Sequence, residues 1–328
     1  MDRKQKIISG LDIVNSVGAE IGPLHRPIVS KGEGNILYVD HEDTKSLREK
    51  YKNDPDVDAD AIVGVDGVWG KNTLSNALNG RTVDYVIASH VVEHVPDLIT
   101  WLSEVRCILN TGGQLRLVVP DRRFTFDILR SETTLSEVFL GYLTKSRVPH
   151  PYLILDFFLK VRDVDCGGVW AGRVDAENLG RKYSFSDALD MARDSLENGV
   201  YRDVHCWVFT PESFAKLFLE LAHTGMLGFA CVDFHDTERD QLEFFVALRS
   251  SEDQEEIISS WQAMVNSFKT SSVVNSIWPQ DAEREISRLK HQLQQSLAAE
   301  ASYRKSKSWR ITAPLRAIAS SLRNFRRN

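Results

Sequence analysis

The sequence predicts an α/β fold in which a doubly wound, mostly parallel sheet ends in an antiparallel strand. Short apolar runs of strand type alternate with amphipathic helical stretches through the first 120 residues, as expected for parallel strands joined by crossovers. Later the order changes, because the apolar runs Phe229–Phe234 and Leu242–Leu248 are separated only by HDTERDQ. A parallel connection needs a longer crossover, so these two strands are expected to be antiparallel neighbours.

Each of the first five strands is predicted from an apolar run that ends at a polar residue or a turn. They are expected at Val17–Ile21, Ile36–Val39, Ala61–Val65, Val83–Ala88 and Leu115–Val119. Helices are expected at residues 3–16, Thr44–Tyr51, Lys71–Leu78 and from Pro96 to the Thr111-Gly112-Gly113 turn. Residues 22–34 hold three glycines and two prolines and are barely enough for a crossover, so no full helix is expected there.

Residues 122–203 interrupt the alternation of strands and helices. This stretch holds aromatic and charged helical segments and the glycine-rich run CGGVWAG. We expect a helical insert after the fifth strand that covers the site and selects the substrate. The core is expected to resume at Val204–Phe209, and Thr210 is expected to cap the next helix, with Pro211 in its first turn.

Three regions are predicted along the chain: a body over residues 1–249, a polar linker over 250–280, and a C-terminal segment over 281–328 with a short helical stretch and a basic amphipathic tail. Residues 304–328 hold eight Lys and Arg and no Asp or Glu, whereas the whole chain has a net charge of -6. An acidic body argues against nucleic acid as its partner. The tail suits an anionic membrane surface or a partner protein such as a glycosyltransferase.

The chain shows none of the usual marks of export. The opening residues MDRKQKIISG turn polar at once, no apolar run approaches a bilayer span, and the four cysteines have no CxxC spacing. These features are typical of a cytoplasmic protein with reduced thiols. The tail adds the expectation of peripheral contact with the inner face of the membrane.

Residues 83–121 carry the most specific pattern in the chain. The run DYVIASHVVEHVPD is followed by LNTGGQLRLVVPD, acidic residues end the first three predicted strands, and the closing strand reads EFFVALR. This arrangement resembles the class I S-adenosylmethionine-dependent methyltransferases, whose fold is a Rossmann-like sheet. The opening GAEIGPLHRPIV and the tail SWRITAPLR resemble methyltransferase-like proteins of bacterial surface-polysaccharide biosynthesis clusters. The resemblance implies S-adenosylmethionine as cofactor and an oxygen of a surface-glycan sugar, or of its precursor, as methyl acceptor.

The resemblance also implies which residues bind the cofactor. Glu20 and Gly22 would lie at its methionine part, Asp40 at the ribose hydroxyls, Asp66 at the adenine, and Ser89 and His90 at the sulfonium side. A carboxylate suits a vicinal diol because its two oxygens accept two hydrogen bonds. The sequence departs from the family pattern after Gly22, where Pro23 stands in place of a Gly-x-Gly loop. This departure keeps open a second hypothesis, a catalytically inactive binding or scaffold module in a glycan-assembly complex.

Three residues are candidates for catalysis. Methyl transfer to a hydroxyl needs a base that takes its proton, and His94, Asp121 and His205 offer suitable side chains on the predicted acceptor side. Arg122 and Arg123 follow Asp121 and suit either a phosphate or uronate of the substrate or an ion-paired loop.

The HxxEH run formed by His90, Glu93 and His94 raises the question of a metal. Some RNA and quinone methyltransferases bind a divalent metal with a similar ExxEH run, and His205 offers a further ligand from another element. The interpretation that the sequence favours is that His94 packs at the start of the helix, so no metal ligand is assigned.

A third class of function is a nucleotide-sugar enzyme that uses a dinucleotide. The missing GxGxxG after the first strand argues against it.

Overall fold

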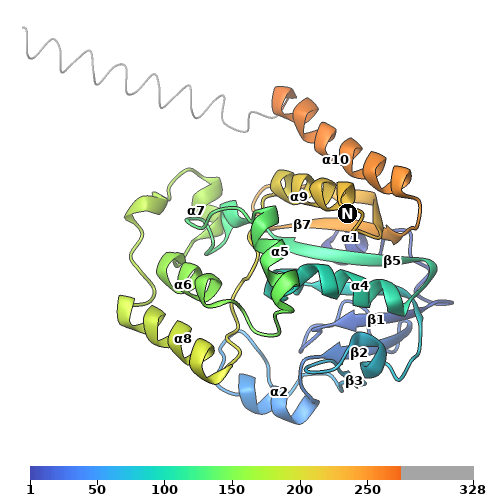
Figure 1. Cartoon of the computed structure of the whole chain (residues 1–328), viewed down its shortest axis with the longest axis horizontal. Coiled ribbons are helices and arrows are strands. Elements are labelled where there is room, and N and C mark those ends of the chain that lie inside the picture. The colour runs from blue at the N-terminus through green and yellow to red at the C-terminus, as the bar shows by residue number, and fades with distance from the viewer. Residues whose placement is uncertain (275–328) are drawn as a thin grey trace, which may run out of the picture. The chain divides into compact units, whose positions relative to one another are not determined.

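The structure is a computed structural model that describes residues 1–274, and the sheet organises this part of the chain. Seven strands form one sheet in the order β3-β2-β1-β4-β5-β7-β6 (Figure 1). The strands are β1 (Val17–Ile21), β2 (Asn35–Asp40), β3 (Gly67–Val68), β4 (Val83–Ser89), β5 (Leu109–Pro120), β6 (Phe229–His235) and β7 (Glu243–Ser250). Strand β7 is antiparallel to β5 and β6, and the remaining pairs are parallel. The predicted Rossmann-like sheet with an antiparallel last strand is confirmed.

The first five helices around the sheet follow the predicted order, and the sixth, α10, lies where a linker was predicted. They are α1 (Arg3–Ile8), α2 (Thr44–Tyr51), α3 (Leu74–Ala77), α4 (Leu98–Ile108), α9 (Pro211–His223) and α10 (Gln254–Val274). Helix α9 begins where predicted, because the hydroxyl of Thr210 accepts a hydrogen bond from the amide of Ser213 in a capping box. As expected, no helix joins β1 to β2.

Side chains alternate between the two faces of the sheet along each strand, so neighbouring residues of a strand belong to two different hydrophobic clusters. Val86 and Ala88 belong to the larger cluster, which includes buried side chains of α3, α4, α9 and α10. Tyr85 and Ile87 belong to the smaller one, which includes Ile7 of α1 and two residues of the loop after β1. Both faces of the central strands are therefore buried, which is the reason that β4 is apolar without a break from Tyr85 to Ala88.

The predicted third strand, Ala61–Val65, is wrong. The strand is only Gly67–Val68, and it pairs with the last two residues of β2. Asp66 makes two hydrogen bonds with Tyr38. Its carboxylate accepts the amide hydrogen of Tyr38 at 2.8 Å, and its own amide donates to the Tyr38 carbonyl at 2.8 Å. The preceding residues form no ladder, so Asp66 comes before β3 and not after it.

The predicted linker over residues 250–280 is wrong for residues 254–268, since α10 begins at Gln254 and this part of it belongs to the compact unit of the body. Trp261 is fully buried in the larger cluster, and its Nε1 donates a hydrogen bond to the carbonyl of Phe229 at 2.9 Å. The compact unit therefore runs from Met1 to Phe268, beyond the predicted end at residue 249. The predicted segment and basic tail at 281–328 lie outside the described residues.

The predicted insert is helical and carries a small core of its own. Its helices are α5 (Leu135–Thr144), α6 (Pro151–Lys160), α7 (Cys166–Trp170) and α8 (Phe185–Asn198), drawn in green and yellow beside the sheet in Figure 1. Ile154 of α6, Ala192 of α8 and Val204 form a buried cluster separate from the two around the sheet. Gly141 lets α5 approach α4, because a Cβ atom there would lie 2.5 Å from the carbonyl oxygen of Pro96.

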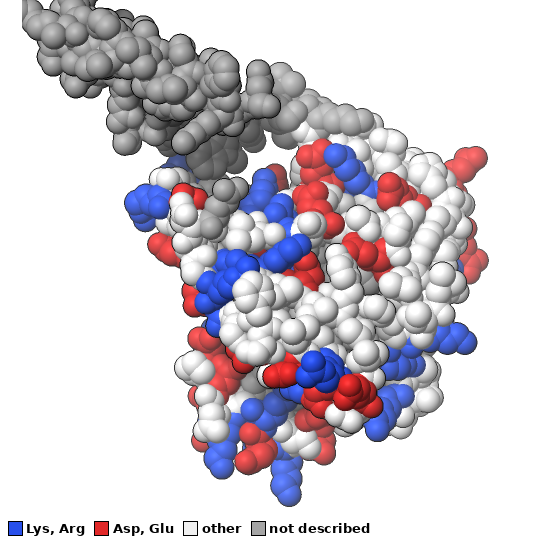
Figure 2. All heavy atoms as spheres, turned by 60° about the vertical axis from the view of Figure 1, so that its left-hand side comes forward, with Lys and Arg blue, Asp and Glu red and all other residues white. Residues whose placement is uncertain are grey.

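The surface of this part of the molecule mixes both signs of charge. Figure 2 shows acidic and basic side chains interspersed with wide uncharged areas on the face turned to the viewer. The insert also exposes large apolar side chains, including Leu143, Phe185, Leu189 and Leu196. Among the described residues, no helix is both long and apolar enough to cross a membrane.

Candidate functional site

The candidate site lies at the carboxyl ends of the parallel strands, where the chain returns from the insert. A short 3-10 helix, η1 (Val92–His94), follows β4. The carbonyl of Glu93 accepts hydrogen bonds from the amides of Cys206 at 2.6 Å and Trp207 at 3.1 Å. The indole of Trp207 donates to the carbonyl of Val95 at 2.6 Å. These bonds bring His205 to the end of β4, although 111 residues of sequence separate it from His94.

Asp40, the last residue of β2, presents one unused carboxylate oxygen. Its Oδ1 accepts a hydrogen bond from the amide of His41 at 2.7 Å and lies 2.6 Å from the Nδ1 atom of that residue. Its Oδ2 is buried and has no hydrogen-bond partner among the described residues. A buried acceptor of this kind is normally satisfied, so Oδ2 fits a ligand that brings hydroxyl groups to the end of β2.

Glu20 and Gly22 shape the loop that follows β1. The Glu20 carboxylate accepts hydrogen bonds from the amides of Ile28, at 2.8 and 3.0 Å, and Val29, at 3.2 Å. Burial raises the pKa of this carboxyl to about 7, against the opposing effect of those amides. Gly22 has a φ of +68°, a conformation that other residues adopt only with strain. The Glu20 carboxylate therefore fixes the loop after β1 through these hydrogen bonds, whereas Gly22 leaves the turn at the start of that loop without a side chain.

Ser89 and His90 take part in a hydrogen-bond network with Arg3, near the start of the chain, and Glu243 of β7. His90 Nε2 lies 2.7 Å from the Glu243 carboxylate, and Arg3 bridges that carboxylate, at 2.6 Å, to the hydroxyl of Ser89, at 2.9 Å. Burial alone would raise the pKa of Glu243, but the hydrogen bonds from His90 and Arg3 lower it to about 2. Sequence analysis missed Arg3 and Glu243 because both partners come from distant elements, α1 and β7.

The imidazoles of His94 and His205 lie edge to face, with ring centroids 4.7 Å apart. His94 Nδ1 is 2.9 Å from an oxygen of Asp203 and forms an ion pair with it, at an angle outside hydrogen-bond geometry. Burial would lower the pKa of His94, yet Asp203 and Glu93 together raise it. In the same pair the pKa of Asp203 is lowered to about 2, because His94 outweighs the effect of burial.

His205 is oriented by a buried chain of charges in the insert. Its Nδ1 lies 2.5 Å from Asp127 Oδ2, and Asp127 Oδ1 accepts a hydrogen bond from Arg130 at 2.8 Å. Arg130 also donates to Asp156 of α6 at 2.8 Å. Burial raises the pKa of Asp127, but the neighbouring His205 and Arg130 outweigh it and hold the pKa below its usual value. Nothing in the sequence near His205 indicates this support, since Asp127 and Arg130 lie at the far end of the insert.

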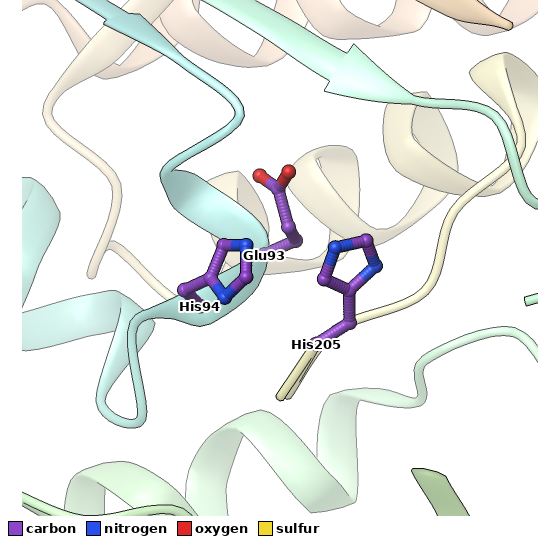
Figure 3. Close-up of side chains that lie close together, drawn as sticks. All are labelled: Glu93, His94 and His205. Atoms are coloured by element: carbon purple, nitrogen blue, oxygen red, sulfur yellow. The ribbon is translucent and has the colours of Figure 1, made fainter. Parts of the chain in front are cut away.

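Glu93 completes the group at the end of β4. Its side chain is fully buried, and neither carboxylate oxygen has a hydrogen-bond partner among the described residues. One ligand-type atom from each of Glu93, His94 and His205 lies within 4.8 Å of the other two, as Figure 3 shows. The structure therefore brings together two of the three predicted catalytic residues with a carboxylate that the sequence analysis had considered only as a metal ligand.

The remaining two predicted site residues, Asp121 and Asp66, bind other partners and do not belong to this group. Asp121 is fully buried and accepts hydrogen bonds from Arg123, at 2.6 Å to Oδ2, and from the hydroxyl of Thr237, at 2.8 Å. Its other oxygen accepts the amide hydrogen of Arg123, so Asp121 caps a turn and has no free oxygen for a proton. Asp66 pairs with Lys31 at 2.7 Å, in addition to its bond with Tyr38.

Comparison with known proteins gives a family. A family model described as "Methyltransferase domain" matches residues 14–221. Among curated proteins, none matches the chain. This chain is 14% identical to a solved structure of the CurJ carbon methyltransferase, with a TM-score of 0.34, and the match covers 75% of this chain and 51% of that chain. The chain thus spans about half the length of that protein.

Two further solved structures resemble the chain to a similar degree. The CcbJ methyltransferase from Streptomyces caelestis is 12% identical, with 76% of this chain and 94% of that chain covered and a TM-score of 0.35. The magnesium protoporphyrin IX methyltransferase from Synechocystis PCC 6803 with bound SAM is 10% identical, with 76% of each chain covered and a TM-score of 0.33. At these TM-scores the likenesses carry no argument about the substrate.

The family match covers more than half of the chain and includes β1, β2, β4 and β5. The open Asp40 oxygen lies at the end of β2, and the histidine pair follows β4, so the polar groups lie where open α/β sheets bind their ligands. The chain therefore belongs to the methyltransferase-domain family and is an S-adenosylmethionine-dependent methyltransferase.

Proposed function

We propose that this methyltransferase methylates a hydroxyl oxygen, and that the acceptor is a sugar of a surface glycan or its precursor. The observation that carries the oxygen acceptor is the pair of imidazoles at the end of β4, each held at Nδ1 by a carboxylate. A hydroxyl is a weak nucleophile until a base takes its proton, and an oriented imidazole is the commonest such base in proteins.

The residues around Asp40 fit the cofactor that the family uses. Asp40 Oδ2 would accept a hydrogen bond from a ribose hydroxyl, which satisfies its missing partner. Gly22, with its positive φ and no side chain, would let the chain after β1 approach the methionine part. Ser89 ends β4 and His90 follows it, and both would lie on the sulfonium side. When bound, S-adenosylmethionine supplies an electrophilic methyl group. Glu20 would not contact the cofactor, because its carboxylate oxygens accept the hydrogen bonds that hold the loop after β1.

His205 is the better base of the pair. Asp127 binds the Nδ1 side of its ring, which leaves Nε2 as the nitrogen that can take a proton. His94 stands beside it with its own carboxylate, Asp203. In the transfer, the hydroxyl loses its proton as the new O–CH3 bond forms and the S–CH3 bond breaks. The side chains of this chain therefore orient the acceptor and remove one proton, and they supply no methyl group.

Aromatic side chains of the insert support a sugar as the acceptor. Phe126 lies 4.7 Å, centroid to centroid, from the His205 ring, and Phe157 lies 6.2 Å from it. Phe126 is 37% exposed, so an aromatic face lies next to the candidate base and remains open to a ligand. Sites that combine aromatic faces with a few convergent polar groups suit ligands that are partly apolar and rich in hydroxyls.

A transfer assay with S-adenosylmethionine labelled in the methyl group tests the proposal. The wild-type chain and His205→Ala are incubated with nucleotide sugars and lipid-linked saccharides, and His223→Ala serves as the control because His223 is an exposed residue of α9. We expect label in the acceptor with the wild type and the control, and a loss of about 100-fold or more with His205→Ala. Label only on carbon or nitrogen acceptors would refute the oxygen proposal, and no transfer in the presence of measurable cofactor binding would favour a binding module.

Contact of residues 304–328 with an anionic membrane surface or a glycosyltransferase remains a prediction, because these residues lie outside the described part of the chain. Liposome sedimentation of the full chain against a chain that ends near Ser302 checks the membrane version. Equal partitioning of the two would discard it.

A further inference from the structure

The carboxylate of Glu93 is the least satisfied polar group in the candidate site. It is fully buried, and neither oxygen has a hydrogen-bond partner among the described residues. The nearest recorded cationic group, His90 Nδ1, is 3.6 Å from Oε1, and His90 is already bonded to Glu243 through its other ring nitrogen. A buried carboxylate without hydrogen bonds is costly, and the ion pair with His90, a ring that also binds Glu243, offsets only part of this cost, so the side chain suits an additional cation.

The backbone brings the three side chains together. The carbonyl of Glu93 accepts hydrogen bonds from the amides of Cys206 and Trp207, so η1 is joined to the segment that carries His205. Figure 3 shows the three side chains gathered from these two segments. One ligand-type atom from each of Glu93, His94 and His205 lies within 4.8 Å of the other two.

Each imidazole in the group has its outer nitrogen next to a carboxylate, through a hydrogen bond at His205 and through an ion pair outside hydrogen-bond geometry at His94. His94 Nδ1 lies 2.9 Å from Asp203, and His205 Nδ1 lies 2.5 Å from Asp127. This leaves the Nε2 atoms for the shared space. Histidines that bind a metal are typically supported in this way, because the outer carboxylate fixes the tautomer and makes the ligating nitrogen more basic. Asp127 is itself held by Arg130, so the support is rigid.

We propose that Glu93, His94 and His205 form a binding site for a divalent transition-metal ion. Two imidazoles and one carboxylate suit Zn²⁺, Mn²⁺, Co²⁺ or Fe²⁺, whereas Mg²⁺ and Ca²⁺ prefer oxygen ligands. Three protein ligands leave at least one position open, as catalytic metal sites require.

The open position gives the metal a role in the proposed reaction, and this part rests on the proposed function. A sugar hydroxyl that binds there loses its proton to solvent more readily, because the metal stabilises the alkoxide. The oxygen then forms the bond to the methyl carbon as the S–CH3 bond breaks. With metal bound, His94 and His205 would act as ligands, and the metal would make the hydroxyl acidic enough to lose its proton to solvent.

Metal binding can be measured without any methyl transfer. Tag-free full-length protein is stripped with chelator, dialysed, and titrated with Zn²⁺ or Mn²⁺ by calorimetry and with Co²⁺ by visible absorption. We expect one ion per chain, a rise in the melting temperature with metal, and no binding by Glu93→Gln. Asp127→Asn keeps all three ligands and is expected to bind about 10- to 100-fold more weakly. Glu49→Gln and His223→Ala, both at exposed positions, are matched controls and should bind as the wild type does.

Glu93→Gln also gives a measurement that does not depend on metal. It replaces a buried carboxylate that has no hydrogen bond by a neutral amide with little change in shape, so the metal-free variant should melt at a higher temperature than the metal-free wild type. This result shows that the variant folds. The site is overturned if the wild type binds no ion stoichiometrically or if Glu93→Gln binds as tightly as the wild type. Methyl transfer in a chain that binds no metal would overturn the site alone, whereas metal binding without transfer to any hydroxyl would count against the proposed function alone.

Discussion

Asp40 offers the most direct test of how this chain holds its cofactor. Replacement of Asp40 by Asn keeps the oxygen that accepts the His41 amide and puts an amide group where the unpartnered Oδ2 now lies. That group donates hydrogen bonds, so it cannot accept one from a ribose hydroxyl. A hydrogen bond to a charged acceptor contributes about 1.5–3 kcal/mol. The loss corresponds to an increase in the Kd for S-adenosylhomocysteine of about 10- to 150-fold.

Isothermal calorimetry with S-adenosylhomocysteine measures this change, and a double-mutant cycle assigns it. The second perturbation is an analogue that lacks one ribose hydroxyl. The wild-type chain should bind the analogue more weakly than the parent compound, and Asp40→Asn should bind the two almost equally. Glu42→Gln is the control, because it removes an exposed charge two residues away. A Kd for Asp40→Asn within about twofold of the wild type would refute the assignment of Asp40 to the ribose.

Three further predictions concern the parts of the fold that support the site. Burial raises the pKa of Glu20 from its ordinary value of 4.5 to about 7, so the folded state holds its proton more tightly than the unfolded state does. The stability that this proton gives is complete below about pH 4.5 and is lost as the pH rises through about 7, a change of about 3 kcal/mol. Glu20→Gln should flatten this dependence in urea denaturation at several pH values, and an unchanged slope would contradict the raised pKa. Trp261→Ala removes a buried ring and the hydrogen bond to Phe229, and should lower the free energy of unfolding by about 3–5 kcal/mol; a change below about 1 kcal/mol would restore the linker interpretation of this segment. Arg130→Met takes the buried arginine away from both Asp127 and Asp156 and leaves Asp127 with His205 alone, so thermal melts should show a loss of about 3–5 kcal/mol, whereas an equal melting temperature would mean that these ion pairs are not needed.

Local signals were enough for most of the sheet. Strand β1 lies where its apolar run predicted it, and β4 differs from the prediction by one residue. The capping box at Thr210 marks the start of α9, and the short link after β6 makes β7 antiparallel. Each of these features depends on residues within a few positions of one another, which is why periodicity and capping predict them.

The sequence was a poor guide where the partner of a residue lies far away along the chain. Asp66 was expected to end a strand, but its bonds to Tyr38 place it before β3. Asp121 was expected to serve as a base, but Thr237, from the link after β6, takes one of its oxygens. Residues 254–268 were expected to belong to a linker, and the burial of Ile257, Trp261 and Met264 in the larger cluster shows that they complete the core.

By itself, the sequence determined the class of fold, the order of the strands along the chain, the insert and the family resemblance. Most of these are properties of local pattern, because alternation, helix caps and turn lengths are written in neighbouring residues. The tertiary structure decided which polar side chains meet. It placed His205 beside His94, buried Glu93 between two segments without a hydrogen bond, and left one oxygen of Asp40 open. The reason is that a site at the ends of several strands is assembled by the packing of the whole sheet, and burial and partnership arise only when that packing is complete.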